Sequence, residues 1–269
     1  ATKAAYRVEL PEKIPELIAR ALHQASSGCK GAVYLELAGD VIHAAVDERK
    51  VLWPAPMREH PRPAINAQQL AEIEGMLEAA SRPVILAGSG VIWSRAEREL
   101  AAFVNASGIP LVTTPQSRGI VAEDHELVFT VAKTAALQKA DLVIILGTRA
   151  NWLNRHFLPP AISADTKVIN INIDPHTIGH MRVPDVGVLA DARTAVVQLH
   201  ELKDYAADRA RFAPWVKQLT ELNGTGVSQG NVITTPAGHI HPQYLVERIG
   251  DFLPRDAIFV VDGHETLEF

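Results

Sequence analysis

The sequence has little of what disulfide-bonded, nucleic-acid-binding or membrane-spanning proteins need. Cys29 is the single cysteine in 269 residues, so no intrachain disulfide can form, and a reducing compartment, the cytoplasm, is expected. The 26 basic and 31 acidic residues are interspersed and sum to −5, which leaves no block suited to nucleic acid or an anionic membrane. The longest apolar runs, such as 142–146, fall far short of the about 20 residues that cross a bilayer.

A content of 47% apolar residues predicts a folded protein with one core or two smaller ones. The start, at Ala1, has neither an initiator Met nor a charged-then-apolar signal pattern, and Phe269 closes the chain just after an expected strand. Both ends are typical of a fragment, or of one chain of a split protein.

The pattern of the first 63 residues predicts a helix, a strand and a linker. Apolar residues within 11–26 follow helical spacing, and the run 32–37 is apolar enough for a strand. Four prolines between Pro54 and Pro63 then predict an extended linker, because proline fixes its own φ and disfavours helix in the residue before it.

From Asn66, a predicted helix N-cap, helices alternate with short apolar strands. Helices are expected from Asn66 through Leu77, over 96–107 up to Gly108, and around 131–137. Nearly all-apolar strands that alternate with helices indicate a parallel sheet covered on both faces, so an α/β, doubly wound, Rossmann-like domain is predicted. The expected strands are 84–87, 111–113, 142–146, 168–173 and 186–189.

Beyond this domain, the polar helical stretch 202–230 contains the run Asn223 to Gly226, which is typical of a connector. A short helix over 242–249 and a buried strand over 258–261 are expected to follow.

Ligands of open parallel sheets bind at the carboxyl ends of the strands. Gly88, Ser89 and Gly90 follow a strand there and precede a helix, as a phosphate-binding turn should. The third glycine of the dinucleotide fingerprint would, however, fall at Trp93. Two interpretations remain open: the glycines let a ligand approach the backbone, or they permit tight packing of the turn.

Two charged residues end other strands of this sheet. Arg149 is suited to holding a diphosphate through paired hydrogen bonds, or it is an ordinary surface residue after a turn. Asp174 can accept hydrogen bonds from ribose hydroxyls, or it can cap the next turn. His176 and His180 stand four apart but lie in an expected loop without a third ligand, so no metal site is predicted in this chain.

In combination these segments resemble the thiamine-diphosphate-dependent enzyme superfamily over essentially the whole chain. The resemblance implies four regions: the end of a pyrimidine-binding domain (1–57), a central nucleotide-binding-type domain (58–200), a linker (201–240) and the start of a diphosphate-binding domain (241–269). The flanking parts would be partial thiamine-diphosphate-binding folds. The matching segments, in the family's order, are 31–41, 82–91, 113–114, 118–119, 123–125, 140–142, 146–149 and 171–174.

The loop Asp262 to Glu268 is similar to that of the 2-hydroxyacyl-CoA lyase and oxalyl-CoA decarboxylase branch: an acidic residue, Gly, two variable residues, Thr, Leu and an acidic residue. Glu265 replaces an asparagine common in that branch. Acetolactate synthases usually carry a Gly-Gln pair in this loop. The resemblance therefore places Gly263, His264, Glu265 and Thr266 on the thiamine diphosphate side.

The resemblance further implies thiamine diphosphate and Mg²⁺ as cofactors, ADP or alternatively FAD in the central domain, and a homodimer or homotetramer, or a complementary chain supplying the missing halves. The family's activating glutamate and its Gly-Asp-Gly…Asn metal motif are absent from these residues, so no catalytic residue is expected here, and the chain alone is expected to be inactive. The resemblance leads to the hypothesis that the chain is a portion of a thiamine-diphosphate-dependent carbon–carbon lyase or decarboxylase acting on 2-hydroxyacyl-CoA or oxalyl-CoA. Its rivals are a FAD-containing, acetolactate-synthase-like carboligase acting on 2-oxo acids and a non-catalytic nucleotide-binding module.

Overall fold

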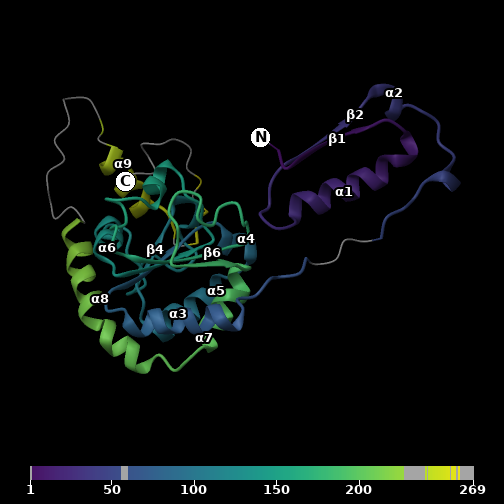
Figure 1. The fold of residues 1–269 in the computed structure, drawn as a ribbon. Helices are drawn as coiled ribbons and strands as arrows, with labels where there is room; N and C mark the ends of the chain where they lie inside the picture. Colours follow the sequence, from purple (N-terminus) through teal and green to yellow (C-terminus); the bar gives the residue numbers. More distant parts are fainter. Residues whose placement is uncertain are drawn as a thin grey trace.

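The computed structural model describes residues 2–55, 60–226, 240, 242–254, 256–258 and 260. Its N-terminal unit is a two-stranded parallel sheet covered by one helix (Figure 1). The sequence did not predict its first strand. Of the described residues up to 55, only Val8 and Val41 are buried. The unit consists of β1 (Ala4–Val8), η1 (Pro11–Lys13), α1 (Ile14–Ser26), β2 (Val33–Leu37), α2 (Gly39–Ile42) and η2 (Glu48–Lys50).

The described residues between this unit and the larger domain lack regular secondary structure. Residues 51–55 and 60–66 form neither helix nor strand, as the prolines predict. Asn66 then caps α3 (Ala67–Ala79), because its side-chain oxygen accepts a hydrogen bond from the Gln69 backbone N–H at 2.9 Å. The predicted helix start is confirmed.

The larger domain contains a five-stranded sheet in the order β4-β3-β5-β6-β7, with every neighbouring pair parallel. Strands β3 and β5 are buried along their whole length, which explains why their sequences lack polar positions. The predicted α/β, doubly wound architecture is confirmed. The strands are β3 (Pro83–Ala87), β4 (Leu111–Thr113), β5 (Leu142–Leu146), β6 (Lys167–Asn172) and β7 (Val186–Leu189).

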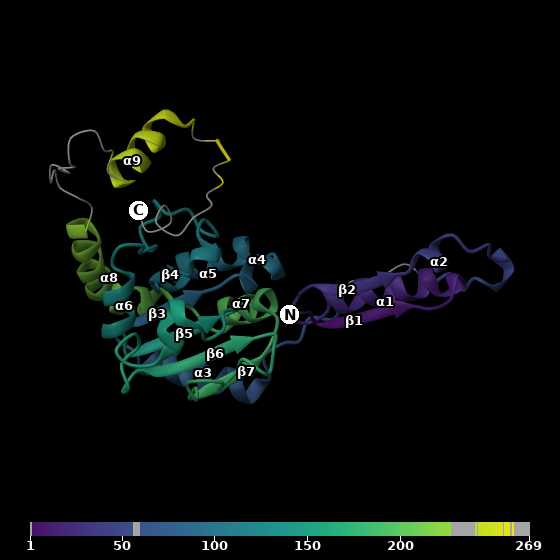
Figure 2. The ribbon, with the colours of Figure 1, turned by 90° about the horizontal axis from the view of Figure 1, so that it is seen from above.

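Helices cover both faces of the sheet. Helix α3 lies on one face with α5 and α7, while α6 contributes to the core on the other (Figures 1 and 2). Gly108 ends α5 at φ +71°, a left-handed conformation that glycine adopts without strain. The remaining elements are α4 (Gly90–Ser94), α5 (Glu97–Ser107), η3 (Pro115–Ser117), α6 (Lys133–Lys139), η4 (Trp152–Phe157), α7 (Ala192–Glu201), α8 (Ala206–Gly226) and α9 (Pro242–Phe252).

Helix α8 occupies much of the segment that the sequence assigned to a linker. Phe212, Trp215 and Leu219 are buried, and they join the cores on the two faces of the sheet. The expected connector from Asn223 to Gly226 is instead the end of this helix. The Asn223 side chain accepts hydrogen bonds from two backbone N–H groups just before α6, so a residue typical of turns serves here as a tertiary contact.

The expected buried strand over 258–261 is wrong for the part of it that the structure describes. Ile258 is 93% exposed and Val260 is 84% exposed, and neither lies in a strand. An apolar run is buried only where neighbouring strands or helices cover it, and no such cover is present at these two residues.

Candidate functional site

The strand order places a topological switch point between β3 and β5. The chain runs from β3 outward to β4, then crosses back over β3 to β5, so the loops after β3 and β5 diverge from a common edge. Ala87 and Leu146 are paired in register at the ends of these strands. The loops 88–90 and 147–149 therefore lie side by side, where doubly wound domains bind ligands.

The glycines of these loops pack against each other. A Cβ on Gly88 would lie 2.3 Å from the Thr148 Cβ, and one on Gly90 would lie 2.6 Å from the Gly147 Cα. The Gly88 N–H donates to the Leu146 carbonyl at 2.9 Å, and the Gly90 N–H donates to the Gly147 carbonyl at 2.8 Å. Tight packing of the turn thus accounts for both glycines, and their N–H groups are already engaged.

The side chains of Arg149 and Asp174 differ in whether they have hydrogen-bond partners within the domain. Arg149 is exposed, and among the described residues no hydrogen bond or ion pair is recorded for its guanidinium, while its carbonyl accepts from Asn154 at 2.8 Å. One carboxylate oxygen of Asp174 accepts from the His176 N–H at 3.0 Å, so Asp174 caps its turn. Its second oxygen leaves capacity for a ligand hydroxyl.

Sequence reasoning missed a cation at this edge. The ammonium group of Lys133, at the start of α6, donates to the Thr113 carbonyl at 2.6 Å, at the end of β4. Burial, followed by nearby Arg118, lowers the pKa of Lys133. The spacing of apolar residues gives no sign of this, because the contact joins segments 20 positions apart.

Arg118 has a partner of its own. Its guanidinium donates two hydrogen bonds of 2.7 Å to the two oxygens of Glu123. This hydrogen bonding holds the pKa of Glu123 below its usual value. Because Glu123 is paired with Arg118, the recorded partner of the Lys133 ammonium group among the described residues is a backbone carbonyl and not a carboxylate.

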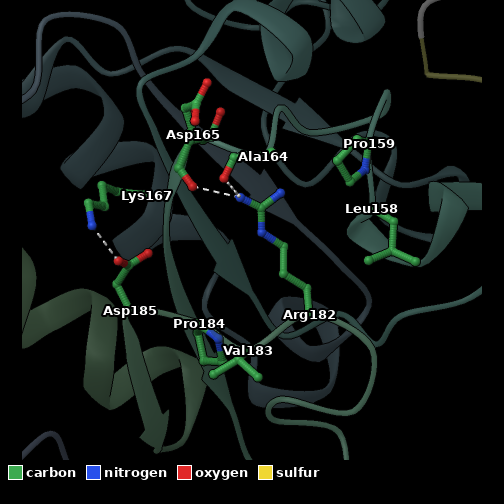
Figure 3. Close-up of a pocket in the computed structure, with 10 residues that line it drawn as sticks. Leu158, Pro159, Ala164, Asp165, Lys167, Arg182, Val183, Pro184 and Asp185 are labelled. Carbon is green, nitrogen blue, oxygen red and sulfur yellow. Dashed lines mark hydrogen bonds and ion pairs between the residues drawn. The ribbon is translucent and has the colours of Figure 1, made fainter.

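A cavity of about 650 Å³ lies at the opposite, amino edge of the sheet (Figure 3). Three of its charged residues have partners: Arg182 donates to four backbone carbonyls, including that of Thr166 at 2.7 Å, and Lys167 pairs with Asp185 at 2.8 Å. Burial lowers the pKa of Arg182. The contacts of Arg182 fasten the loop 157–166 to the loop between β6 and β7, so we assign this cavity a structural role.

The remaining predicted site residues, Gly263, His264, Glu265 and Thr266, lie outside the described residues. Within the part of the chain that the structure describes, no cluster of three or more potential ligands could hold a metal, His176 and His180 included. Of the described helices, none combines the length and apolarity needed to cross a membrane.

The fold and its switch point define a doubly wound α/β domain with a parallel sheet. Residues 70–199 match the family model of the thiamine pyrophosphate enzyme central domain. The chain therefore belongs, through this domain, to the thiamine pyrophosphate enzyme family.

Full-length relatives extend the match over most of the chain. The chain is 30% identical over 261 residues to the 2-hydroxyacyl-CoA lyase of Arabidopsis thaliana, covering 93% of this chain and 44% of the relative. It is 31% identical to the acetolactate synthase of Mycobacterium bovis, covering 96% and 43%, respectively. For the oxalyl-CoA decarboxylase of Escherichia coli the identity is 34%, and the match covers 75% and 36%.

A solved structure supports the fold. The chain superimposes with a TM-score of 0.64 and 24% identity on the X-ray structure of an enzyme described as thiamin diphosphate-dependent, from Mycobacterium smegmatis. That match covers 77% of this chain and 40% of the other. The chain thus spans less than half the length of each of these four proteins.

Proposed function

We propose that this chain is part of a thiamine-diphosphate- and Mg²⁺-dependent carbon–carbon lyase or decarboxylase acting on 2-hydroxyacyl-CoA or oxalyl-CoA. Similarity to relatives with both activities supports this, but acetolactate synthases are equally similar. The loop Asp262 to Glu268 carries the choice of branch, because its order of acidic, glycine, threonine and acidic residues follows the CoA-dependent enzymes. Bound thiamine diphosphate supplies the electron sink for breaking the carbon–carbon bond.

In this proposal residues 58–200 form the central domain, and 1–57 and 241–269 belong to the two catalytic domains. The segment 201–240 leads from one to the other and contributes α8, which packs against the central domain. The whole enzyme assembles as a homodimer or homotetramer, or with a chain that supplies the missing halves. Residues 263–266 face thiamine diphosphate.

The central domain is proposed to hold ADP at the switch point. Loop 88–90 carries no bulky side chain, and the N–H groups of Gly88 and Gly90 are already engaged, so we assign neutralisation of the phosphate charge to side chains. Arg149 offers the donors for a phosphate, and Asp174 offers a free carboxylate oxygen for a ribose hydroxyl. These residues thus fit an adenine nucleotide through side chains rather than through a backbone phosphate loop.

The purified chain is expected to bind ADP and to carry no flavin. Arg149→Met should weaken ADP binding about tenfold or more, because it removes a charge-assisted hydrogen bond to phosphate. Isothermal titration calorimetry measures the affinity, and the absorption spectrum reports flavin.

Arg98→Met is the matched control, since Arg98 is an exposed arginine on α5 and should leave the ADP affinity unchanged. A yellow protein with flavin absorbance would instead favour the acetolactate-synthase-like alternative. Equal ADP affinities for Arg149→Met and the wild type would remove Arg149 from the site.

The chain by itself is expected to show no thiamine-dependent turnover of oxalyl-CoA or 2-hydroxyacyl-CoA, because the family's activating glutamate and metal motif are absent from its 269 residues. Chromatographic detection of acyl-CoA products measures this, with the oxalyl-CoA decarboxylase of Escherichia coli as the positive control. Turnover by the isolated chain would contradict the prediction.

Sequencing the gene beyond both ends separates the enzyme from a non-catalytic nucleotide-binding module. If neither the glutamate nor the metal motif were encoded there, and no partner chain supplied them, the module would be the better description.

A further inference from the structure

We propose that Lys133 is a phosphate-binding residue, which together with Arg149 flanks the loop after β3 from its two sides. This inference rests on the proposed function and deepens it. The ligand chemistry is a phosphate or diphosphate group, carried either by an adenine nucleotide or by a coenzyme A thioester.

The register of the sheet places Lys133 and Arg149 on either side of the loop that follows β3. Ala87 at the end of β3 is paired with Thr113 of β4 on one side and with Leu146 of β5 on the other. Because neighbouring strands lie about 4.8 Å apart, the ends of β4 and β5 are separated by roughly 10 Å. Lys133 is anchored at the first end and Arg149 follows the second, with Gly88 between them.

Lys133 has a charge that its described surroundings do not neutralise. It lies partly buried and donates to the Thr113 carbonyl, but no ion pair is recorded for it among the described residues. Two of its three ammonium protons therefore remain available. Burying a cation against a carbonyl alone is costly, and an anionic ligand offsets that cost.

Several nearby groups that could pair with Lys133 or bind a phosphate already have partners. Glu123, the carboxylate that accompanies Arg118, receives both of its hydrogen bonds. The backbone N–H groups just before α6 donate to Asn223, and those of Gly88 and Gly90 donate to carbonyls. A phosphate that lies over Gly88 thus finds no N–H donor at Gly88 or Gly90, and Lys133 and Arg149 are the cations placed to neutralise it.

The test is calorimetric titration of the full 269-residue chain with inorganic pyrophosphate, ADP and coenzyme A at one fixed ionic strength. Lys133→Met is expected to weaken pyrophosphate binding about tenfold or more, and Lys133→Arg to retain affinity within about threefold, since the second variant keeps the charge. Lys139→Met is the matched control, because Lys139 lies on the same helix but is exposed at the amino edge of the sheet. Thermal melting shows that each variant is folded.

The three titrants separate the sources of the phosphate. A Lys133-dependent loss for ADP assigns the site to the nucleotide, and a loss confined to coenzyme A assigns it to the substrate. Lys133-dependent pyrophosphate binding without any ADP binding would uphold the anion site while the nucleotide proposal fails. If Lys133→Met binds ADP as tightly as the wild type does, Lys133 does not bind the phosphates of ADP, while the proposal that the central domain holds ADP still stands. The inference as a whole fails if pyrophosphate and coenzyme A are also bound normally by Lys133→Met, if Lys139→Met loses as much affinity, or if the wild type binds none of the three.

Discussion

Gly88→Ala is expected to destabilise the chain by about 3 kcal/mol, the upper range for a small-to-large change at a tightly packed position. The added Cβ would lie 2.3 Å from the Thr148 Cβ and 2.7 Å from the Gly147 carbonyl oxygen. Neither atom can withdraw cheaply, because the second belongs to the backbone and accepts the hydrogen bond of Gly90. Urea unfolding followed by circular dichroism measures the loss.

Gly75→Ala is the matched control for this experiment. Gly75 lies inside α3, and a Cβ there would meet no atom within 4 Å. Alanine favours helix more than glycine does, so this variant should gain about 0.5 to 1 kcal/mol. Equal stability of Gly88→Ala and the wild type would show that the two loops do not pack as closely as the structure has them.

Trp215→Ala is expected to cost about 3 to 5 kcal/mol, which is typical of removing a buried aromatic side chain. Trp215 is 3% exposed, and its indole N–H donates to the Pro83 carbonyl at 3.1 Å. The substitution would remove this hydrogen bond and open a cavity between α8 and the sheet. The midpoint of urea unfolding measures the effect.

Lys217→Ala controls for changes to α8 that do not touch the core, since Lys217 is exposed on the same helix. Its unfolding midpoint should stay close to that of the wild type. An unchanged midpoint for Trp215→Ala would mean that α8 contributes nothing to the stability of the domain, as a simple linker would. The result therefore also decides whether the central domain is better bounded beyond residue 200.

Local patterns predicted much of this fold because they are short-range. The fully apolar run from Leu142 to Leu146 suits only a strand covered on both faces, and Asn66 satisfies N–H groups within its own helix. The same reasoning misread α8: its surface is largely polar, and glycines and asparagine near its end are typical of connectors. Burial of Phe212 and Trp215 against distant strands outweighed that preference.

Short-range patterns likewise predicted part of the candidate site, and long-range contacts account for the rest. The order of residues along the chain identifies those that follow the strands, among them Gly88, Arg149 and Asp174. It therefore also predicts the edge of the sheet at which a ligand binds. Tertiary structure decided what each one does: the glycines serve loop packing, Asp174 caps a turn, and Arg149 remains without a recorded partner among the described residues. Only the fold brought Lys133 to the end of β4, because its position depends on how a helix crosses a sheet, and no spacing along the chain encodes that crossing.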